Sequence, residues 1–389
     1  MRVSPGLPED AGPGILYALN ASSRALPPRE AAGRVREAVH AGRERGARLL
    51  LKKVDSTLRG NLAAELLAAA EAGGFERVVF CPAFPAQGRT LEGGLLRVDG
   101  APLSRAPLFE GGKRSRLPDR PAELLKGAFR TAEIGIETVR GGGLREAISG
   151  APAGAAVCVD AETDEDLDLL AAAVEGEGRW LCAGAAGWAR ATARRLPGVP
   201  PAPAGPSRLS RPAVFLVGSL NPLSRDQARY LARGSGVRLF TVGVERRLED
   251  GAALKDYAAR IGEMMGVHLR TDGARAAVVV TDPPPVGVSS RPGAAGEVAR
   301  WLAELGAGRL WRREAGGLLF CGGDVAQAAW EVLEAGAMRL EEELLPGIPR
   351  CRFLGGRYGG LPVVTKPGGF GKLDALSHIL SLWRGEEDR

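Results

Sequence analysis

The chain has 389 residues, of which 45% are hydrophobic and 25% are charged, and this length exceeds what one hydrophobic core usually supports, so two domains are expected. No apolar stretch approaches the roughly 18 residues that a membrane span needs, and the amino terminus lacks the apolar core of a signal peptide, so we expect a cytoplasmic protein. The net charge of +6 is modest and the aromatic fraction is only 5%, which disfavours a nucleic-acid-binding surface.

The cysteines and histidines form no pattern of a metal site, a disulfide framework or a catalytic triad. The cysteines are scattered singly, and an odd number without a secretion signal argues against a disulfide scaffold. Most of them lie in or beside apolar runs, which is typical of buried thiols. The residues concerned are Cys81, Cys158, Cys182, Cys321 and Cys351, with His40, His268 and His378. No metal ligands are predicted among them.

In the first part of the chain, apolar runs alternate with helical patterns. Alternation of this kind predicts a mainly parallel sheet flanked by helices. Residues 91–120 are rich in Gly, Pro and Arg and are expected to form a hairpin excursion or a lid. The predicted strands are residues 15–19, 48–51, 77–81, 155–159 and 180–183, and the predicted helices are residues 28–45 and 61–72.

The segment from Lys53 to Asn61 gathers a cation, a carboxylate, two hydroxyls, a guanidinium and a glycine. It follows an apolar run and precedes a helical pattern, which places it at the carboxyl end of a strand, where open α/β sheets bind ligands. Arg59 can hold a carboxylate or phosphate through two parallel hydrogen bonds, and Lys53 offers a compact positive charge. The alternative interpretation is an ordinary strand-to-helix turn with Asn61 as the N-cap.

Three further loops follow predicted strands in this part of the chain. Residues 82–90 carry Gln87 and Arg89 behind two prolines, and they form either a ligand contact or a structural turn. The acidic residues 160–166 are expected mainly at a helix start, where Thr163 caps the helix and carboxylates favour its dipole. Within that run only Asp160 has a secondary functional interpretation. Residues 184–187, Gly-Ala-Ala-Gly, are expected to serve close packing.

A proline-rich segment divides the chain. The prolines within residues 196–206 cannot continue a helix or a central strand, and this composition is typical of a semi-rigid spacer. We therefore expect a first domain at residues 1–196, a linker at 197–210 and a second domain at 211–389. The predicted strands of the second domain are residues 213–217, 238–242, 276–280, 317–321 and 361–364, and its predicted helices are residues 293–305 and 325–335, with another that begins after Asn221-Pro222.

Three predicted strand ends of the second domain carry glycines. The residues concerned are Ser219 after Gly218, the run Gly322, Gly323, Asp324 and Val325, and the pair Gly368 and Gly369. Backbone amides at glycine turns before a helix can receive phosphate oxygens, and their position at one sheet edge favours a nucleotide site. Neither a Walker A loop nor a GxGxxG after a first strand is present, which disfavours ordinary P-loop ATPases and dinucleotide enzymes.

Taken together, these motifs resemble those of the four-carbon acid sugar kinases. The most specific parts are residues 53–61, 82–90, 322–324 and 366–371, which follow one another in the family's order. That family joins an amino-terminal sugar-acid domain to a carboxyl-terminal nucleotide domain and phosphorylates tetronates such as threonate, erythronate or 3-oxo-tetronate with ATP. The resemblance implies two α/β domains, each a mainly parallel sheet flanked by helices, with the ligand site in the cleft between them.

The resemblance also implies roles for individual residues. Asp55 and Arg59 are expected to be catalytic, with Asp55 orienting the attacking hydroxyl. ATP and Mg²⁺ are the implied cofactors, because phosphoryl transfer needs positioning and charge neutralisation more than covalent chemistry. The expected substrate-binding residues are Lys53, Ser56, Arg24, Gln87 and Arg89, and the expected nucleotide-binding residues are Ser219, Gly322, Gly323, Asp324, Val325, Gly368 and Gly369.

Three departures from the family's pattern concern the sugar side. Family members usually open with a strand ending in an Ala-Asp-Asp-Leu-Thr-Gly type motif, and nothing like it precedes Gly14, so we expect the chain to start one strand and one helix late. Residues 20–24 lack the family's acid before a Ser-Arg pair, and residues 184–187 lack the hydroxyl of a Gly-Ser-Ala-Gly motif. The substrate therefore differs, or catalysis is impaired.

Two functions stay open at this point. The first is an ATP-dependent kinase that phosphorylates a hydroxyl of a small sugar acid. The second is a catalytically impaired relative that binds nucleotide or sugar acid and acts as a regulatory protein. A basic nucleic-acid-binding protein is the least favoured class. The expected partners are thus a sugar acid and ATP, with no nucleic acid and no membrane, and a homodimer is one expected assembly.

Overall fold

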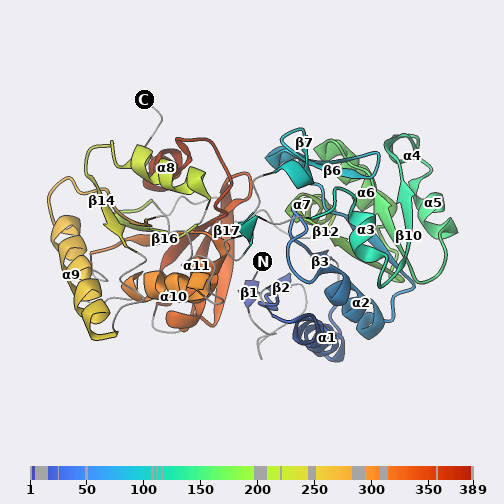
Figure 1. Ribbon diagram of the computed structural model, residues 1–389, viewed down its shortest axis with the longest axis horizontal. Helices are drawn as coiled ribbons and strands as arrows, with labels where there is room; N and C mark the ends of the chain where they lie inside the picture. Colours follow the sequence, from blue (N-terminus) through green and yellow to red (C-terminus); the bar gives the residue numbers. More distant parts are fainter. Residues whose placement is uncertain are drawn as a thin grey trace.

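The computed structural model describes residues 2–4, 16–24, 26–48, 51–106, 109–110, 113–114, 117–196, 208–219, 221–243, 251–282, 294–306, 314–355 and 358–386. Most of the linker predicted from its prolines therefore lies outside the described residues. The described residues form two halves, each with a mainly parallel sheet flanked by helices, as Figure 1 shows. None of their helices is long and apolar enough to cross a membrane.

The amino-terminal half is built on a five-stranded parallel sheet with the strand order β10-β11-β4-β12-β3. Its central strands are buried along nearly their whole length, as expected for parallel strands covered by helices on both faces. The strands are β3 (Lys52–Lys53), β4 (Arg77–Cys81), β10 (Arg130–Ile134), β11 (Ala155–Val159) and β12 (Trp180–Gly184).

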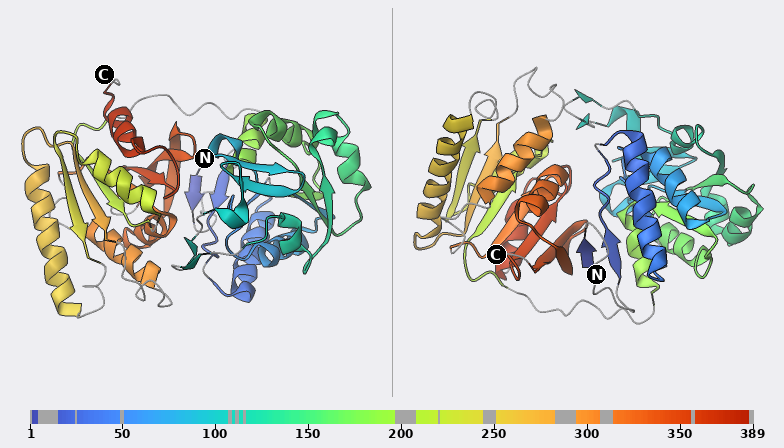
Figure 2. Two further views of the ribbon diagram at one scale, coloured as in Figure 1. Left: turned by 45° about the horizontal axis from the view of Figure 1, so that its top comes forward. Right: turned by 90° about the horizontal axis from the view of Figure 1, so that it is seen from below.

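Seven helices of the described residues flank this sheet. The longest, α1 and α2, pack against each other on one side of the amino-terminal half (Figure 2). Thr163 begins α6 with the predicted capping box, since its side chain accepts from the amide of Asp166. The helices are α1 (Pro28–Glu44), α2 (Leu62–Gly73), α3 (Pro121–Leu125), α4 (Ile136–Arg140), α5 (Leu144–Gly150), α6 (Asp164–Ala173) and α7 (Ala186–Arg194).

The excursion predicted between the second and third sheet strands consists of short antiparallel hairpins. The hairpin of β5 and β6 turns at Gly93 and Gly94, which both have positive φ. Glycine favours this conformation, so these two residues indicate the turn in the sequence. The hairpin interpretation is confirmed. The elements are η1 (Pro85–Gln87), β5 (Arg89–Glu92), β6 (Leu95–Val98), β7 (Ala101–Pro102), η2 (Leu103–Arg105), β8 (Phe109–Glu110) and β9 (Lys113–Arg114).

The carboxyl-terminal half is built on a nine-stranded sheet with the order β14-β15-β13-β16-β19-β18-β17-β1-β2. The five neighbouring strands β14, β15, β13, β16 and β19 run parallel to one another. The sheet then continues with β18 and β17, which form an antiparallel hairpin. The strands are β13 (Ala213–Val217), β14 (Val237–Val242), β15 (Ala276–Thr281), β16 (Gly317–Cys321), β17 (Ala337–Leu345), β18 (Ile348–Leu354) and β19 (Pro362–Lys366).

Two separate hydrophobic cores lie on the two faces of this sheet. The first core includes Trp301 and Ala329 from the helices α10 and α11, and the second includes Leu231 and Trp383 from α8 and α12. Figure 1 shows the same division, with α8 on one face of the sheet and α10 and α11 on the other. The helices are α8 (Pro222–Leu231), α9 (Gly251–Leu269), α10 (Ala294–Gly306), α11 (Gly323–Val332) and α12 (Ala375–Arg384).

The first predicted strand belongs to the other half of the molecule. Residues 17–19 form β2 (Tyr17–Leu19), which pairs in parallel with β1 (Arg2–Ser4), and β1 pairs with β17. Its expected place in the amino-terminal sheet is therefore wrong. A short apolar run shows where a strand lies, but the partner is chosen by contacts far away in the sequence. The pattern also missed α9, β10 and the hairpin of β17 and β18.

Candidate active site

The loop between β3 and α2 is organised around the carboxylate of Asp55. Arg59 donates from Nε to Oδ1 at 3.2 Å and from Nη2 to Oδ2 at 2.9 Å, so the guanidinium holds the carboxylate at two points. The amide and the hydroxyl of Thr57 also donate to Oδ1, at 2.9 and 2.5 Å. This loop is therefore preorganised by its own side chains, with Arg59 still 30% exposed.

A segment distant in the sequence lies against this loop. Arg24 donates from Nη2 to Oδ2 of Asp55 at 3.0 Å, and its side chain is 48% exposed. Asn61 occupies the N-cap position of α2, as the alternative interpretation expected, but its amide makes no capping bond. The amide instead donates to the carbonyls of Ser23 and Leu26, at 3.1 and 2.9 Å. Asn61 thereby fixes the segment that carries Arg24.

Burial and the neighbouring charges shift the pKa values of Asp55 and Lys53 away from their ordinary values. Burial raises the pKa of Asp55, but Arg59 and Arg24 lower it by charge and hydrogen bonding, and the resulting pKa lies well below the usual range. Burial lowers the pKa of Lys53, Asp55 opposes this, and the positive charges of Arg24, Lys52 and Arg59 lower it further. The side chain of Lys53 still reaches solvent, which suits a cation that meets an anionic ligand.

Backbone strain marks the same place. Leu58 is fully buried yet adopts a left-handed conformation with φ of 61°, which a branched aliphatic residue rarely does. Ser22, in the segment that faces the loop, has φ of 49°. Strained residues of this kind persist where the surroundings over-determine them, and they cluster at functional sites. The strain thus agrees with the functional interpretation of residues 53–61. Ser56 lies half-buried within the same loop.

The second predicted substrate loop reaches the carboxyl-terminal half. Gln87 donates from Nε2 to the carbonyl of Pro346 at 2.6 Å. The guanidinium of Arg89 lies 5.4 Å from the ring centroid of Phe370, and Phe84 meets the same ring edge-on at 6.2 Å. The loop that carries Gln87 and Arg89 therefore touches the glycine-rich loop after β19.

Arg89 also belongs electrostatically to the cations around Asp55. Burial lowers its pKa, the charges of Asp99 and Asp55 raise it, and that of Arg59 lowers it. Arg89 hydrogen-bonds the carbonyl of Gln87, and its buried Nε has no partner among the described residues. Together with Arg24, Lys53 and Arg59 it forms a group of four cations, which we call the basic cluster. Such a cluster can bind a carboxylate or a phosphate.

The three glycine-bearing strand ends meet, as the sequence predicts. β13, β16 and β19 are adjacent in the sheet, so Ser219, Gly322 and Gly368 lie at one edge. A Cβ on Gly322, whose φ is 115°, would lie 3.4 Å from the amide nitrogen of Ser219. A Cβ on Gly368 would overlap the hydroxyl of Ser219, and one on Gly369 would lie 2.9 Å from Nδ2 of Asn221. A side chain at Gly368 or Gly369 would crowd the side chains of Ser219 and Asn221, and the positive φ of Gly322 favours glycine. We call the strand ends at residues 218–219, 322–325 and 368–369 the glycine turns.

One of the turns opens directly into a helix. Gly322 is the N-cap of α11 without a side-chain capping bond, so the first amides of Gly323, Asp324 and Val325 point out of the helix end. Asp324 is exposed, whereas Val325 is buried against the sheet. Helix amides of this kind, with the dipole behind them, suit phosphate oxygens. The described residues contain no group of three His, Cys, Asp or Glu side chains that could hold a metal ion.

Three buried polar residues lie below the glycine turns, and none of them was among the predicted site residues. Ser224 donates to the carbonyl of Gly368 at 2.7 Å, and Gln227 donates to the carbonyls of residues 370, 371 and 372 at 3.1, 3.3 and 2.7 Å. Lys366, the last residue of β19, is only 1% exposed. Ser224 and Gln227 share the face of α8 that carries its core residues, and this polar interruption of an apolar stripe was the available signal.

Asp160 serves the fold rather than the candidate site. Its two oxygens accept from the amides of Gly93 and Gly94 at 2.8 and 2.9 Å, which closes the turn between β5 and β6. Burial raises the pKa of Asp160, although both amides oppose the shift. Its turn-closing contacts favour the structural interpretation of this residue.

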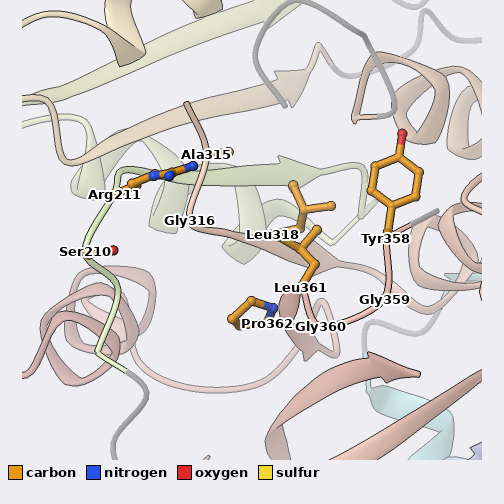
Figure 3. Close-up of a pocket in the computed structure, with 10 residues that line it drawn as sticks. All are labelled: Ser210, Arg211, Ala315, Gly316, Leu318, Tyr358, Gly359, Gly360, Leu361 and Pro362. Carbon is orange, nitrogen blue, oxygen red and sulfur yellow. The ribbon is translucent and has the colours of Figure 1, made fainter. Parts of the chain in front are cut away.

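A cavity of about 420 Å³ lies at the opposite edge of the carboxyl-terminal sheet (Figure 3). It is lined by residues at the starts of β13, β16 and β19, including Arg211, Leu318 and Tyr358. Ligands of open parallel sheets bind at the carboxyl ends of the strands, and the glycine turns occupy that end. We therefore assign the candidate site to the glycine turns and the basic cluster, and not to this cavity.

Two family models match this chain, one in each half. A family described as the sugar-binding N-terminal domain matches residues 9–192, and one described as the nucleotide-binding C-terminal domain matches residues 214–376. A solved structure from Salmonella typhimurium LT2 superposes with a TM-score of 0.76 at 19% identity and covers 97% of this chain and 92% of that chain. One from Haemophilus influenzae gives a TM-score of 0.68 at 20% identity, with 98% and 94% covered. Both share the fold.

Curated relatives are similar over most of their length. A D-threonate kinase from Cupriavidus necator is 34% identical over 93% of this chain and 86% of its own. The D-threonate kinase of Salmonella typhimurium is 30% identical, with 95% and 89% covered. A D-erythronate kinase from Heliobacterium modesticaldum is 29% identical, with 92% and 85% covered.

Proposed function

Because this chain belongs to the four-carbon acid sugar kinase family, we propose that it transfers the terminal phosphoryl group of ATP to a hydroxyl of a four-carbon sugar acid, D-threonate first among them. One observation carries the proposal. The loop that bears Arg89 touches Phe370 of the glycine-rich loop, so a cluster suited to an acid lies beside turns suited to a nucleotide. Three relatives named D-threonate kinase are 30%, 33% and 34% identical to this chain.

On the sugar side, the basic cluster binds the carboxylate of the substrate. Asp55 fixes Arg59 and Arg24 in one orientation, so little side-chain entropy is lost when an anion binds between them. Lys53 adds a charge from the end of β3. Because Asp55 is fully ionised and already accepts several hydrogen bonds, its proposed role is to position the two arginines rather than to accept the hydroxyl proton.

On the nucleotide side, the backbone holds the phosphates. The amides of Gly323, Asp324 and Val325 receive phosphate oxygens at the start of α11, and Gly368 and Gly369 allow the chain to approach closely. Mg²⁺ bound with the nucleotide would supply further charge neutralisation, and the exposed carboxylate of Asp324 in that turn would help to hold it. In the transfer the hydroxyl oxygen forms a bond to the terminal phosphorus, the bond to the bridging oxygen breaks, ADP leaves, and the hydroxyl proton passes to solvent.

The proposal is tested by ADP release from ATP and Mg²⁺ with a panel of D-threonate, D-erythronate, 3-oxo-tetronate and longer sugar acids. We expect D-threonate to give the highest kcat/KM. If no member of the panel releases ADP, while MgADP and the sugar acid both raise the unfolding temperature, the chain is the catalytically impaired relative instead. If the protein shows neither turnover nor ligand-induced stabilisation, both functions are excluded.

A further inference from the structure

Lys366 is a buried cation without an acidic partner. Its side chain is 1% exposed, and its Nζ donates to the carbonyl of Pro367 at 3.0 Å and lies 3.9 Å from Sγ of Cys321. No carboxylate in the described part of the chain forms an ion pair with it. Burying an ammonium group is unfavourable unless a negative charge compensates it. The position therefore calls for a counter-charge.

The sheet register places Lys366 at the strand ends that lead into the glycine turns. Val217 pairs with Cys321 and Cys321 with Lys366, so the three residues form the last row of the parallel strands. The next residues along the three chains lead into the glycine turns. The amide of Gly322 donates to the carbonyl of Lys366 at 2.9 Å, which ties the turn before α11 to the lysine itself.

The other charged groups near Lys366 are paired or exposed to solvent. On the neighbouring strand β18 the nearest charge in register is Arg350, opposite Val364, and it is paired with Glu342 at 2.7 Å. Asp324 in the first turn of α11 is exposed. From α8 the buried polar groups are neutral, and the thiol of Cys321 is the titratable group in contact. Burial lowers the pKa of Lys366, as expected for an ammonium that lacks its anion.

We propose that Lys366 is a positioning residue of the nucleotide site, a buried ammonium under the glycine turns whose counter-charge is the polyphosphate of the bound nucleotide. Its positive charge adds to the electrostatic field of the α11 amides, and its side chain does not contact the phosphates. This inference rests on the proposed function, because it assumes that a nucleotide binds at these turns. When the nucleotide binds, its negative charge compensates the positive charge of the buried Lys366 side chain.

Lys366→Met tests the proposal, since methionine keeps the shape and apolar stem of lysine without the charge. Isothermal titration with MgADP should show a Kd raised about tenfold or more. The unfolding temperature of the ligand-free variant should be unchanged or higher, because an uncompensated buried charge is removed. Lys126→Met, which removes an exposed lysine in the amino-terminal half, controls for net charge and should bind MgADP as the wild type does.

The pH dependence supplies a second measurement on the unmodified protein. Between about pH 8 and 10 the nucleotide phosphates are fully ionised, since their second pKa lies at about 6. Burial lowers the pKa of Lys366 in the ligand-free protein and the bound polyphosphate raises it, so MgADP should bind with proton uptake and more weakly as pH rises toward the ordinary lysine pKa. Lys366→Met should abolish this dependence, and Cys321→Ala should keep it.

The proposal is overturned if Lys366→Met binds MgADP within about threefold of the wild type, if the wild-type affinity is the same at both ends of this pH range, or if Cys321→Ala abolishes the dependence. If MgADP does not bind the wild type at all, the proposed function fails together with the inference. If the wild type binds MgADP tightly but with an affinity that does not depend on pH, the result contradicts the inference about Lys366 and leaves the proposed function standing.

Discussion

At the scale of single residues, the chemistry of the sugar side depends on what Asp55 already holds. Five hydrogen bonds from Arg24, Thr57 and Arg59 occupy its two oxygens. The sequence made Asp55 the natural candidate to orient the attacking hydroxyl, since it was the carboxylate in the motif. Its contacts favour a different use, in which it aims two arginines. A sequence shows that an acid and two bases are near one another, but not which of them are paired.

Asp55→Asn should lower the free energy of unfolding by about 1–3 kcal/mol at neutral pH, because Arg24 and Arg59 lose their charged acceptor. The low native pKa means that this stabilisation is present above the ordinary carboxyl value of about 3.9 and is lost as pH falls below it. The difference between variant and wild type, measured by urea unfolding, should therefore narrow below about pH 4.

Asp168→Asn is the matched control for this measurement. Asp168 pairs with Arg194 on the surface with about half of its side chain exposed, so its loss should change the stability by no more than about 0.5 kcal/mol. An equal effect of the two substitutions would show that the Asp55 cluster is an ordinary surface ion pair.

Arg59→Lys should lower kcat/KM for the sugar acid about a hundredfold, because lysine cannot hold Asp55 and an anion with one planar group. The KM for ATP should change little. Arg130→Lys, at an exposed position on the edge strand β10, should leave both constants unchanged. ADP release measures these constants, and a loss of less than about threefold for Arg59→Lys would remove this residue from the substrate site.

At the scale of elements, the glycine turns show which signals were legible in the sequence. A glycine required by close backbone approach is visible as a residue type, so the meeting of the ends of β13, β16 and β19 could be predicted from the strand pattern and the parallel sheet. Ser224 and Gln227 could not, because a polar residue on an apolar helix face does not show what it bonds. The loop after β19 depends on these bonds from α8.

Gly368→Ala should abolish measurable MgADP binding with a modest effect on folding, because its Cβ would collide with the hydroxyl of Ser219 and lie 2.6 Å from its Cβ. Adding Ser219→Gly to this variant removes both obstacles and should restore part of the affinity. Gly262→Ala, on α9 with open space around it, should bind normally. Isothermal titration measures the affinity of each variant for MgADP. If Gly368→Ala binds MgADP as tightly as the wild type, the phosphates do not bind at the glycine turns.

At the scale of the whole molecule, the sequence predicts two α/β halves and their order, and the structure adds how they touch. Parallel strands and helices follow from local periodicity. The pairing of β1 with β17, the bond from Gln87 to the carbonyl of Pro346 and the packing of Phe84 and Arg89 on Phe370 join residues far apart in the chain, and local patterns do not encode such pairs. The predicted ligand cleft between the halves stays a prediction.

These contacts predict that the two ligands bind cooperatively. In the wild type, saturating D-threonate should tighten MgADP binding about tenfold, a typical coupling. Phe370→Leu keeps the apolar bulk but loses the ring contacts, so each ligand alone should bind nearly normally while the enhancement falls toward one. Phe129→Leu, a partly buried ring in the amino-terminal core, should keep the enhancement. Equal enhancement in both variants would show that this contact does not couple the halves.

The central claim is that a sugar acid at the basic cluster receives a phosphoryl group from a nucleotide at the glycine turns. Phosphorus NMR of the wild type with ATP, Mg²⁺ and D-threonate tests it most directly, with the double variant Arg59→Ala/Gly368→Ala as the control. We predict a new phosphomonoester resonance that grows as the terminal phosphate of ATP disappears, and no such resonance in the control. Unchanged ATP with every sugar acid of the panel, or release of inorganic phosphate alone, would contradict the account.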